Sequence, residues 1–253
     1  MVVLKHKAIR SIMLAMLLAA GLLVVGLMAL VEPAQATFPG NNGDIAFSSN
    51  RSGGYQIYSL SSTGTEQNLN PVTTNLAGTD HDPAYSPDGT KVAFSRTNGG
   101  ETQIWTISAT GGMNVNQITT KGTDNRDPTW SPDGTKIAFA SNRSGSYQIY
   151  SLSSTGTEQN LNPVTTNLAG TDYDPVYSPD GTKVAFTRIT AGKHDIWTIN
   201  STGGGGTNQI TTKPGNDVTP DWQVLPKGPP GPPGPPGGGP PGGPPGGGPG
   251  PPP

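Results

Sequence analysis

The 253-residue sequence contains no cysteine, few histidines and few charged or aromatic residues. The absence of cysteine excludes disulfide bonds, thiol catalysis and metal sites built on thiolates. Residues 37–226 carry 11 basic and 16 acidic side chains, a net charge of −5. They show no basic patch and no interleaving of basic with aromatic residues, so we do not expect a nucleic acid as the partner.

Motifs typical of common enzymes are also missing. The sequence has no G-x-S-x-G nucleophile turn, no H-E-x-x-H zinc motif and no Walker-type phosphate loop. Within residues 37–226 the only histidines are His81 and His194. We therefore expect a protein that is not an enzyme.

Residues 1–36 have the pattern of an export signal. Lys5, Lys7 and Arg10 precede an apolar stretch, and the following E-P-A-Q-A ends in an A-x-A cleavage pattern. We expect cleavage before Thr37, which places the protein in the periplasm or at the cell surface. The apolar stretch is also long enough to span a bilayer, so an uncleaved membrane anchor stays open as the alternative.

Residues 227–253 consist only of lysine, glycine and proline. The three-residue spacing of glycine breaks at Pro240, whereas a collagen triple helix needs that spacing without interruption. Such a segment cannot bury apolar surface, so we expect a disordered tail that is partly polyproline II and acts as a spacer.

The region between these ends is an internal repeat. Each unit starts with an apolar triad of the form I/V-A-F, continues with an I-Y or I-W pair and a glycine-containing polar turn, and ends with a short segment such as N-Q-I-T-T. The stretches 55–80 and 147–172 are identical. Four short β-type runs per unit, repeated about every 46 residues, predict the four-stranded blades of a β-propeller. The triads lie at 45–47, 92–94, 137–139 and 184–186.

The order of the runs predicts how the propeller closes. The region opens on the second strand of a blade and ends, at residues 219–225, on the first strand of another. We expect this last strand to pair into the first blade, which gives an all-β ring of four four-stranded blades without a free edge. An open meander would leave two edges unpaired. A monomer is expected, although the duplication leaves open a dimer in which two chains share a larger ring.

The residues of the repeat also resemble a known family. D-P-T-W-S-P-D-G-T-K-I-A-F-A-S-N-R-S-G-S-Y-Q-I-Y, from Asp127, is similar to the repeat of TolB-like propellers, and the opening F-P-G-N-N-G-D-I-A-F and closing T-P-D-W-Q-V-L-P are similar to the ends of such domains. The resemblance covers nearly all of residues 37–226. It implies an exported bacterial propeller with a binding role, as in TolB, a periplasmic protein of the Tol–Pal system. TolB carries six blades after an α/β domain, whereas we expect four blades and no α/β domain in this chain.

The S-P-D-G motif before each triad reads as turn chemistry. Proline sets φ at the second turn position, aspartate suits the third, and glycine at the fourth takes the left-handed conformation. We therefore assign structural roles to Asp88, Asp133 and Asp180. The S-N-R-S-G segments at 49–53 and 141–145 read as turns between the second and third strands.

Acidic residues also precede the proline of each first strand. We expect them to meet at one mouth of the central channel, either as local turn caps or as a site for a cation or a basic ligand group. Ca²⁺ is the cation that carboxylate oxygens favour, and it would bind Asp82, Asp127 and Asp174, although no D-x-D-x-D-G loop is present. No other cofactor is expected. The predicted site residues are Asp80, Asn125, Asp172 and Asp217 at the third position before the proline, His81, Arg126 and Tyr173 at the second, and Asp82, Asp127 and Asp174 at the first.

The second of these positions holds a different residue in every repeat, and in the last repeat this residue is Val218. Different side chains at equivalent places could read a ligand, or they could be surface positions that vary freely. Aromatic residues that recur once per unit are assigned to packing between blades. They are Tyr85, Trp130, Tyr177, Trp222, Phe47, Phe94, Phe139 and Phe186.

These features favour a non-catalytic exported scaffold that binds a protein, peptide or glycan of the cell envelope at the acidic channel mouth. One alternative is a hydrolase or lyase that acts on glycans or peptides through the same acids. The repetition argues against it, because acid and base roles require unequal environments. A structural cell-surface protein with the tail as its spacer is the other alternative.

Overall fold

The computed structural model describes residues 43–74, 77–156, 158–166 and 170–225. The predicted export signal and the glycine–proline tail lie outside these residues. Within them the fold is all-β apart from two single-turn 3₁₀ segments, η1 (Glu66–Asn68) and η2 (Glu158–Asn160). No helix in this part of the chain is long and apolar enough to cross a membrane.

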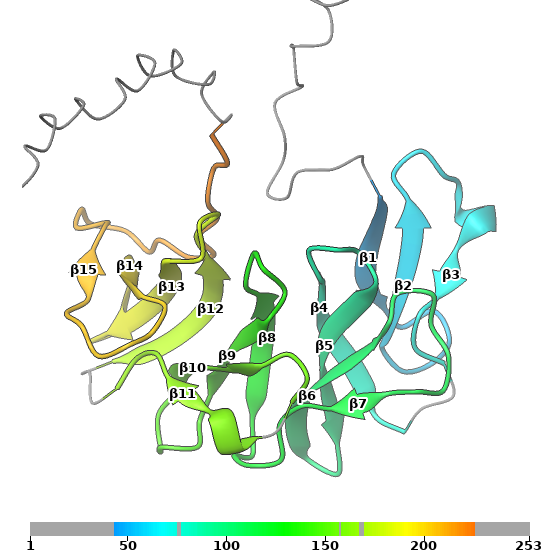
Figure 1. The fold of residues 1–253 in the computed structure, drawn as a ribbon, viewed down its shortest axis with the longest axis horizontal. Helices are drawn as coiled ribbons and strands as arrows, with labels where there is room; N and C mark the ends of the chain where they lie inside the picture. Colours follow the sequence, from blue (N-terminus) through cyan, green and yellow to red (C-terminus); the bar gives the residue numbers. More distant parts are fainter. Residues whose placement is uncertain (1–42, 75–76, 157, 167–169, 226–253) are drawn as a thin grey trace, which may run out of the picture.

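The strands form four antiparallel meanders (Figure 1). The first contains β1 (Asp44–Ser49), β2 (Gln56–Ser61) and β3 (Asn70–Pro71). The second contains β4 (Thr79–Tyr85), β5 (Lys91–Asn98), β6 (Glu101–Ser108) and β7 (Asn116–Gln117). The third contains β8 (Asn125–Trp130), β9 (Lys136–Ser141), β10 (Gln148–Ser153) and β11 (Asn162–Pro163). The fourth contains β12 (Thr171–Tyr177), β13 (Lys183–Thr190), β14 (Lys193–Asn200) and β15 (Asn208–Gln209).

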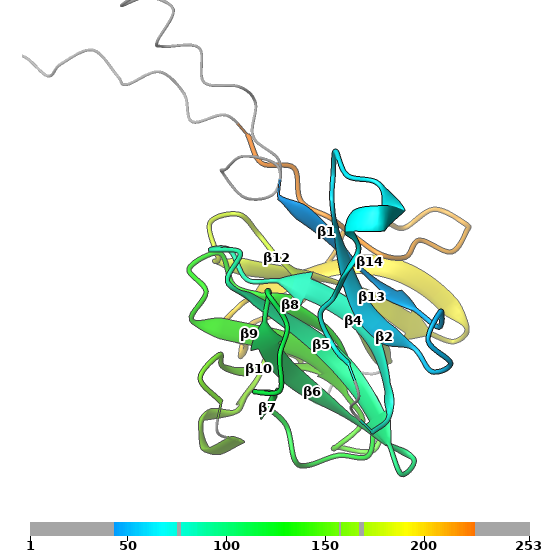
Figure 2. The same cartoon turned by 90° about the vertical axis from the view of Figure 1, so that its right-hand side faces the viewer.

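These sheets are the blades of a four-bladed propeller fold, as the repeat predicted. They follow one another along an arc, with the short strands β3, β7, β11 and β15 on its outside (Figure 1). Along the inner side the first strand β8 contacts the first strands of both neighbouring blades, β4 and β12. Turned by 90°, the sheets lie one behind another, so that each inner blade packs between two neighbours (Figure 2).

This stacking explains why the second strand of each blade is apolar on both faces. Phe94, Phe139 and Phe186 are fully buried, and three apolar clusters fill the spaces between successive blades. The Trp130 indole N–H donates to the carbonyl oxygen of Ala84 in the preceding blade at 3.0 Å. Trp222 makes the same bond to the carbonyl of Val176 at 3.3 Å. The assignment of the repeated aromatics to packing between blades is confirmed for Tyr85, Trp130, Tyr177, Phe94, Phe139 and Phe186, whereas Phe47 stacks on Tyr58 of its own blade.

The S-P-D-G motifs are turns, as predicted. In the first copy the Gly89 N–H donates to the Ser86 carbonyl at 2.8 Å, and Gly89 has φ of +69°. Ser86 Oγ donates to Asp88 Oδ1 at 2.6 Å and accepts the Lys91 N–H at 3.0 Å. Hydrogen bonds from Ser86 and Thr90 hold the pKa of Asp88 below its usual value. The same bonds recur at Asp133 and Asp180.

The predicted closure of the ring is not confirmed. Among the described strands β1 pairs with β2 alone, and residues 217–225 form no strand. That segment packs instead against the fourth blade, where the Asp217 N–H donates to the His194 carbonyl at 3.0 Å and the Thr219 N–H to Thr187 Oγ1 at 3.1 Å. It lies where the first strand of a next blade would lie, and the first sheet has three strands.

Candidate binding site

The aspartate before each proline sits within the first strand of its blade, not in the loop before it. Asp82, Asp127 and Asp174 have φ of +52°, +55° and +51°, and the strand register shifts beside each of them. The proline that follows has no N–H and cannot donate a hydrogen bond to the neighbouring strand. At the bulge this hydrogen bond is not required. Aspartate tolerates the left-handed conformation better than most residues. The same β-bulge with a left-handed aspartate therefore places one carboxylate in each of these three blades.

Asp82, Asp127 and Asp174 lie on the successive first strands β4, β8 and β12, with Asp127 on the middle strand. Burial first, and then the negative charges of Asp82 and Asp174, raise the pKa of Asp127 to about 7. Thr187 Oγ1 donates to Asp174 Oδ2 at 3.0 Å. The middle carboxylate thus has an acidic neighbour on each side, and we call Asp82, Asp127 and Asp174 the acidic triplet.

The residues at the third position before the proline serve the blade interior. Asp80 has no exposed surface and makes a two-pronged ion pair with Arg96, at 2.6 and 2.8 Å. Asp172 pairs with Arg188 in the same way, with both contacts at 2.7 Å. In the third blade Asn125 takes this place, and its Oδ1 accepts from Arg143 at 3.0 Å. These three side chains are committed to partners, so we leave them out of the proposed site.

Each of these arginines also stacks on aromatic rings of its own blade. The Arg96 guanidinium lies 5.1 Å from the Phe94 ring centroid and 5.4 Å from that of Trp105. Arg188 repeats the arrangement over Phe186 and Trp197. The acid, the cation and the two rings form one buried unit, in which Asp80 or Asp172 neutralises a charge that would otherwise be costly to bury.

The residues between the two acidic positions flank the triplet. Tyr173 lies against Tyr147, with ring centroids 4.7 Å apart, and the Arg126 guanidinium lies 5.2 Å from the Tyr147 ring. Arg126 pairs with Asp124, and the Tyr147 hydroxyl donates to Asp124 as well. On the other side of the triplet, His81 lies 4.7 Å from the ring of Tyr55. Two aromatic pairs thus border the acidic triplet.

The remaining predicted residue, Asp217, is half-buried on the fourth blade and lies apart from the ion pairs of the other blades. Val218, beside it, is 49% exposed.

Sequence reasoning missed the partners of these acids. Every repeat has one arginine two or four residues after the phenylalanine of its triad, and this recurrence was the signal that could have revealed the ion pairs. Tyr55 and Tyr147 are the first residues of the two identical stretches, which marks them as equivalent. The arginines concerned are Arg51, Arg96, Arg143 and Arg188.

No group of three or more histidine, aspartate or glutamate side chains in the described part of the chain is arranged to hold a metal ion. The predicted Ca²⁺ site at Asp82, Asp127 and Asp174 therefore gains no support. The triplet contributes charge and hydrogen-bond acceptors to its surroundings.

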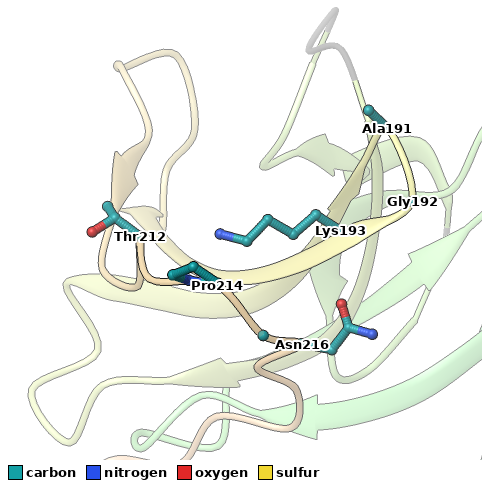
Figure 3. A pocket seen from close by; sticks show the side chains of 7 residues that line it. Ala191, Gly192, Lys193, Thr212, Pro214 and Asn216 are labelled. Atoms are coloured by element: carbon teal, nitrogen blue, oxygen red, sulfur yellow. The ribbon is translucent and has the colours of Figure 1, made fainter.

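A separate hollow lies beside the turn between β13 and β14 of the fourth blade (Figure 3). Lys193 reaches into it, and its Nζ donates to Asp195 Oδ1 at 2.7 Å. None of the predicted site residues lines this hollow, and the cation in it already has an acidic partner. Its lining consists of Ala191, Gly192, Lys193, Thr212, Pro214, Gly215 and Asn216.

Comparison with known proteins agrees with this architecture. Residues 67–167 match the TolB beta propeller domain. The fold superposes on a structure assigned as TolB from Agrobacterium tumefaciens with a TM-score of 0.60 and 26% identity over 70% of this chain. The chain is a TolB-like β-propeller. No curated protein sequence matches it.

The TolB-like propeller spans only part of these relatives. It covers 65% of the Agrobacterium chain and 42% of the TolB of Acinetobacter baumannii, which matches at a TM-score of 0.57 and 24% identity over 69% of this chain. A nidogen/laminin complex matches at 0.56 with 12% identity, over 69% of this chain and 63% of that one. At these lower identities the likeness establishes the fold alone. A TolB-like propeller is a fold suited to a binding scaffold.

Proposed function

We propose that this TolB-like propeller is a non-catalytic scaffold that binds a cationic group of a protein or peptide partner at the acidic triplet. The proposal rests on one observation: neighbouring first strands each carry an aspartate with a left-handed backbone conformation at the same position. Left-handed non-glycine residues are strained and cluster at functional sites. The pKa of Asp127 is raised because burial and the charges of Asp82 and Asp174 outweigh the opposing effect of the nearby Arg126 guanidinium.

The surroundings of the triplet favour lysine or arginine as the group that binds. A positive charge between the carboxylates would relieve their mutual repulsion, and the tyrosine pair at 147 and 173 offers ring faces to the carbon chain or guanidinium of such a side chain. Because burial of Asp127 is incomplete, its carboxylate is within reach of a ligand.

Binding of a basic peptide tests the proposal directly. The chain is titrated with a lysine- and arginine-rich peptide and with the same peptide carrying glutamate instead, and heats of binding are measured. Asp127→Asn is expected to weaken binding of the basic peptide about tenfold or more, because it removes a partly buried charge partner. Glu101→Gln, which removes one charge at an exposed position outside the triplet, is the matched control.

The pH dependence sharpens the same test. A cation binds the ionised carboxylate, so affinity should fall as the pH is lowered through about 7, the pKa of Asp127. This pH dependence should vanish in Asp127→Asn. Equal affinities for the basic and acidic peptides, or equal losses in Asp127→Asn and Glu101→Gln, would disprove the proposed site.

A second candidate function rests on the same raised pKa. Asp127 has an acidic neighbour on either side, so its environment differs from those of Asp82 and Asp174, as an acid–base pair requires. This favours a hydrolase or lyase that acts on glycans or peptides, with Asp127 as the proton donor. Turnover of a glycan or peptide panel that Asp127→Asn abolishes would support it, and a silent panel would remove it.

We also propose export to the periplasm or cell surface, with residues 1–36 as the signal and a cell-envelope protein as the partner. The basic residues, apolar stretch and A-x-A pattern support this location. N-terminal sequencing of the protein recovered from cells checks it, with Thr37 as the expected first residue. An intact Met1 in a membrane fraction would instead indicate an anchor.

A further inference from the structure

The two ends of the arc expose apolar side chains whose equivalents in the inner blades are buried. At the first position of the I/V-A-F triad, Ile45 in β1 is 59% exposed. Its equivalents Val92, Ile137 and Val184 are fully buried. In those blades the first strand pairs alongside, with Trp130 opposite Ile137 and Tyr177 opposite Val184. Ile45 is exposed because none of the described strands pairs with β1 on that side.

The opposite end shows the matching deficiency. Ile210, just after β15, is 53% exposed, whereas Ile118 at the same place in the second blade is 2% exposed. Ile118 is covered by the turn of the next blade, so closely that a Cβ added at Gly156 would lie 2.8 Å from its Cδ1. For Ile210, the equivalent turn of a following blade would be the one around Gly64, which belongs to the first blade.

A polar pair is divided between the same two ends. Arg51 stacks on Phe47 and Tyr58 as the other arginines stack on their rings, but it has no acid from a first strand. Its nearest acid is the exposed Glu66, at 4.0 Å. Asp217 occupies the third position before Pro220, as Asp80 and Asp172 do before their prolines, yet no arginine of the described residues makes an ion pair with it. Arg51 and Asp217 correspond to Arg143 and Asn125 of the third blade, where Arg143 donates to Asn125 Oδ1 at 3.0 Å, and are therefore complementary halves of that contact.

We propose that two copies of this chain complete one ring, in which residues 217–225 of each copy form the first strand of the other copy's first blade. A strand from a second copy pairs with β1, covers Ile45 and brings Asp217 to Arg51, while the Gly64 turn of the same copy covers Ile210. Each contact repeats one that the inner blades already make, so the interface between copies continues the packing between blades.

The shape of the arc favours a second copy over closure within one chain. β1 lies at one end of the arc, and residues 217–225 leave from the fourth blade on the other side of the opening (Figure 1). Closure within the chain would require every blade to rotate against its neighbour, and those interfaces are filled by close-packed side chains. A second copy fills both ends and leaves the packing unchanged. Each copy gives a strand and receives one, as closed two-fold assemblies do.

The inner blades also predict the register of the new pair. His81 lies opposite Ser95 and Tyr173 opposite Thr187, so Val218 should lie opposite Ser48 of the other copy. Directly opposed residues on antiparallel strands are close enough for a disulfide. Because the chain has no cysteine, a pair of introduced cysteines reports this contact without interference.

The test uses the full chain as it is purified from cells, after any cleavage of the signal. Two variants, Ser48→Cys and Val218→Cys, are purified reduced, mixed, oxidised gently and run on a non-reducing gel. The proposal predicts a covalent product at twice the subunit mass from the mixture. The double variant should give the same product. Closure within one chain would give no product from the mixture and an internal disulfide at the subunit mass from the double variant, which would overturn the proposal.

A control variant separates pairing from random collision. Thr212→Cys places a thiol on the exposed loop that leads to the same segment, outside the predicted register. Mixed with Ser48→Cys it should give no covalent product, and equal cross-linking by both mixtures would overturn the proposal. The unmodified chain should also have twice its subunit mass in solution by light scattering, and a monomer would overturn the proposal.

Charge reversal provides an independent check. Arg51→Asp alone and Asp217→Arg alone each oppose like charges across the interface and should weaken association by about 100-fold or more. When the two variants are mixed or co-expressed, residue 51 of each copy again meets an opposite charge at residue 217 of the other copy. The mixed dimer should therefore form. A mixture that stays monomeric would overturn the proposal.

Discussion

The inner blades and the two ends of the arc are built from nearly the same sequence, yet they bury different amounts of it. Arg188 and Arg51 come two and four residues after the phenylalanine of their second strand, and they lie at similar distances, 5.0 and 5.4 Å, from its ring. Arg188 is almost completely buried with Asp172, whereas the side chain of Arg51 is 36% exposed. Burial in this molecule is therefore set by the neighbouring blade and not by the residue type.

The largest expected effect concerns the stability lost when the buried or the exposed arginine is removed. Arg188→Ala should reduce the free energy of unfolding by about 3–5 kcal/mol, because it leaves the fully buried Asp172 carboxylate without its cation. Arg51→Ala should cost less than about 1 kcal/mol in the dissociated chain, because an exposed charge gains little from its partner. Urea denaturation followed by tryptophan fluorescence, at low protein concentration, measures both.

Arg188→Lys is the control for charge alone, since lysine keeps the cation and loses the two-pronged geometry. It should recover part of the stability that Arg188→Ala loses. Equal destabilisation by Arg188→Ala and Arg51→Ala in the dissociated chain would show that the missing neighbour does not explain the different burial.

A second prediction concerns the acidic triplet, whose middle member has neighbours on both sides while Asp82 is exposed. Burial and the two flanking charges raise the pKa of Asp127 from 3.8 to about 7, so folding favours its protonated form. The native state then binds more protons than the unfolded chain between pH 4 and 7, and the contribution of Asp127 to stability falls as pH rises through that window.

Asp127→Asn should therefore leave stability nearly unchanged near pH 4 and raise it by about 1–3 kcal/mol above pH 7, because asparagine accepts the left-handed backbone and carries no charge. Asp82→Asn should stabilise less, since it relieves one repulsion at an exposed position. Unfolding curves at pH 4.5 and pH 8 measure the difference. A gain for Asp127→Asn that is the same at both pH values would contradict the raised pKa.

The repeat pattern predicted the blades because each local signal agreed with the global fold. The period, the S-P-D-G turns and the recurring aromatics all point to the same four-stranded unit, and the structure confirms them. The ring closure depended on a different kind of information. Residues 219–225 carry the pattern of a first strand, but pairing with β1 is set by the angle between blades, which sequence periodicity does not encode.

The candidate site was predicted only in part, and for a physical reason. Asp80 and Asp82 are both acids near one proline, so composition alone gives them the same role. The strand places successive side chains on opposite faces, and the bulge at Asp82 alters that alternation. Asp80 consequently turns inward to Arg96 while Asp82 stays exposed. Only the partner on the next strand separates a buried ion pair from a surface carboxylate.

The smallest expected effect sharpens the comparison at the open end of the arc. Thr219 has φ of +53° at the place where the inner blades have aspartate, and a β-branched residue is poorly suited to the left-handed region. Thr219→Asn should stabilise the chain by about 0.5–1 kcal/mol, or about 2–4 °C in Tm. Thr212→Asn, at an exposed position whose φ is not positive, should leave Tm unchanged. Differential scanning calorimetry compares the two variants. Equal midpoints would mean that residues 217–225 do not hold the bulged conformation of the inner strands in solution, whereas a gain confined to Thr219→Asn would show that this segment is already shaped as a first strand before any partner strand pairs with it.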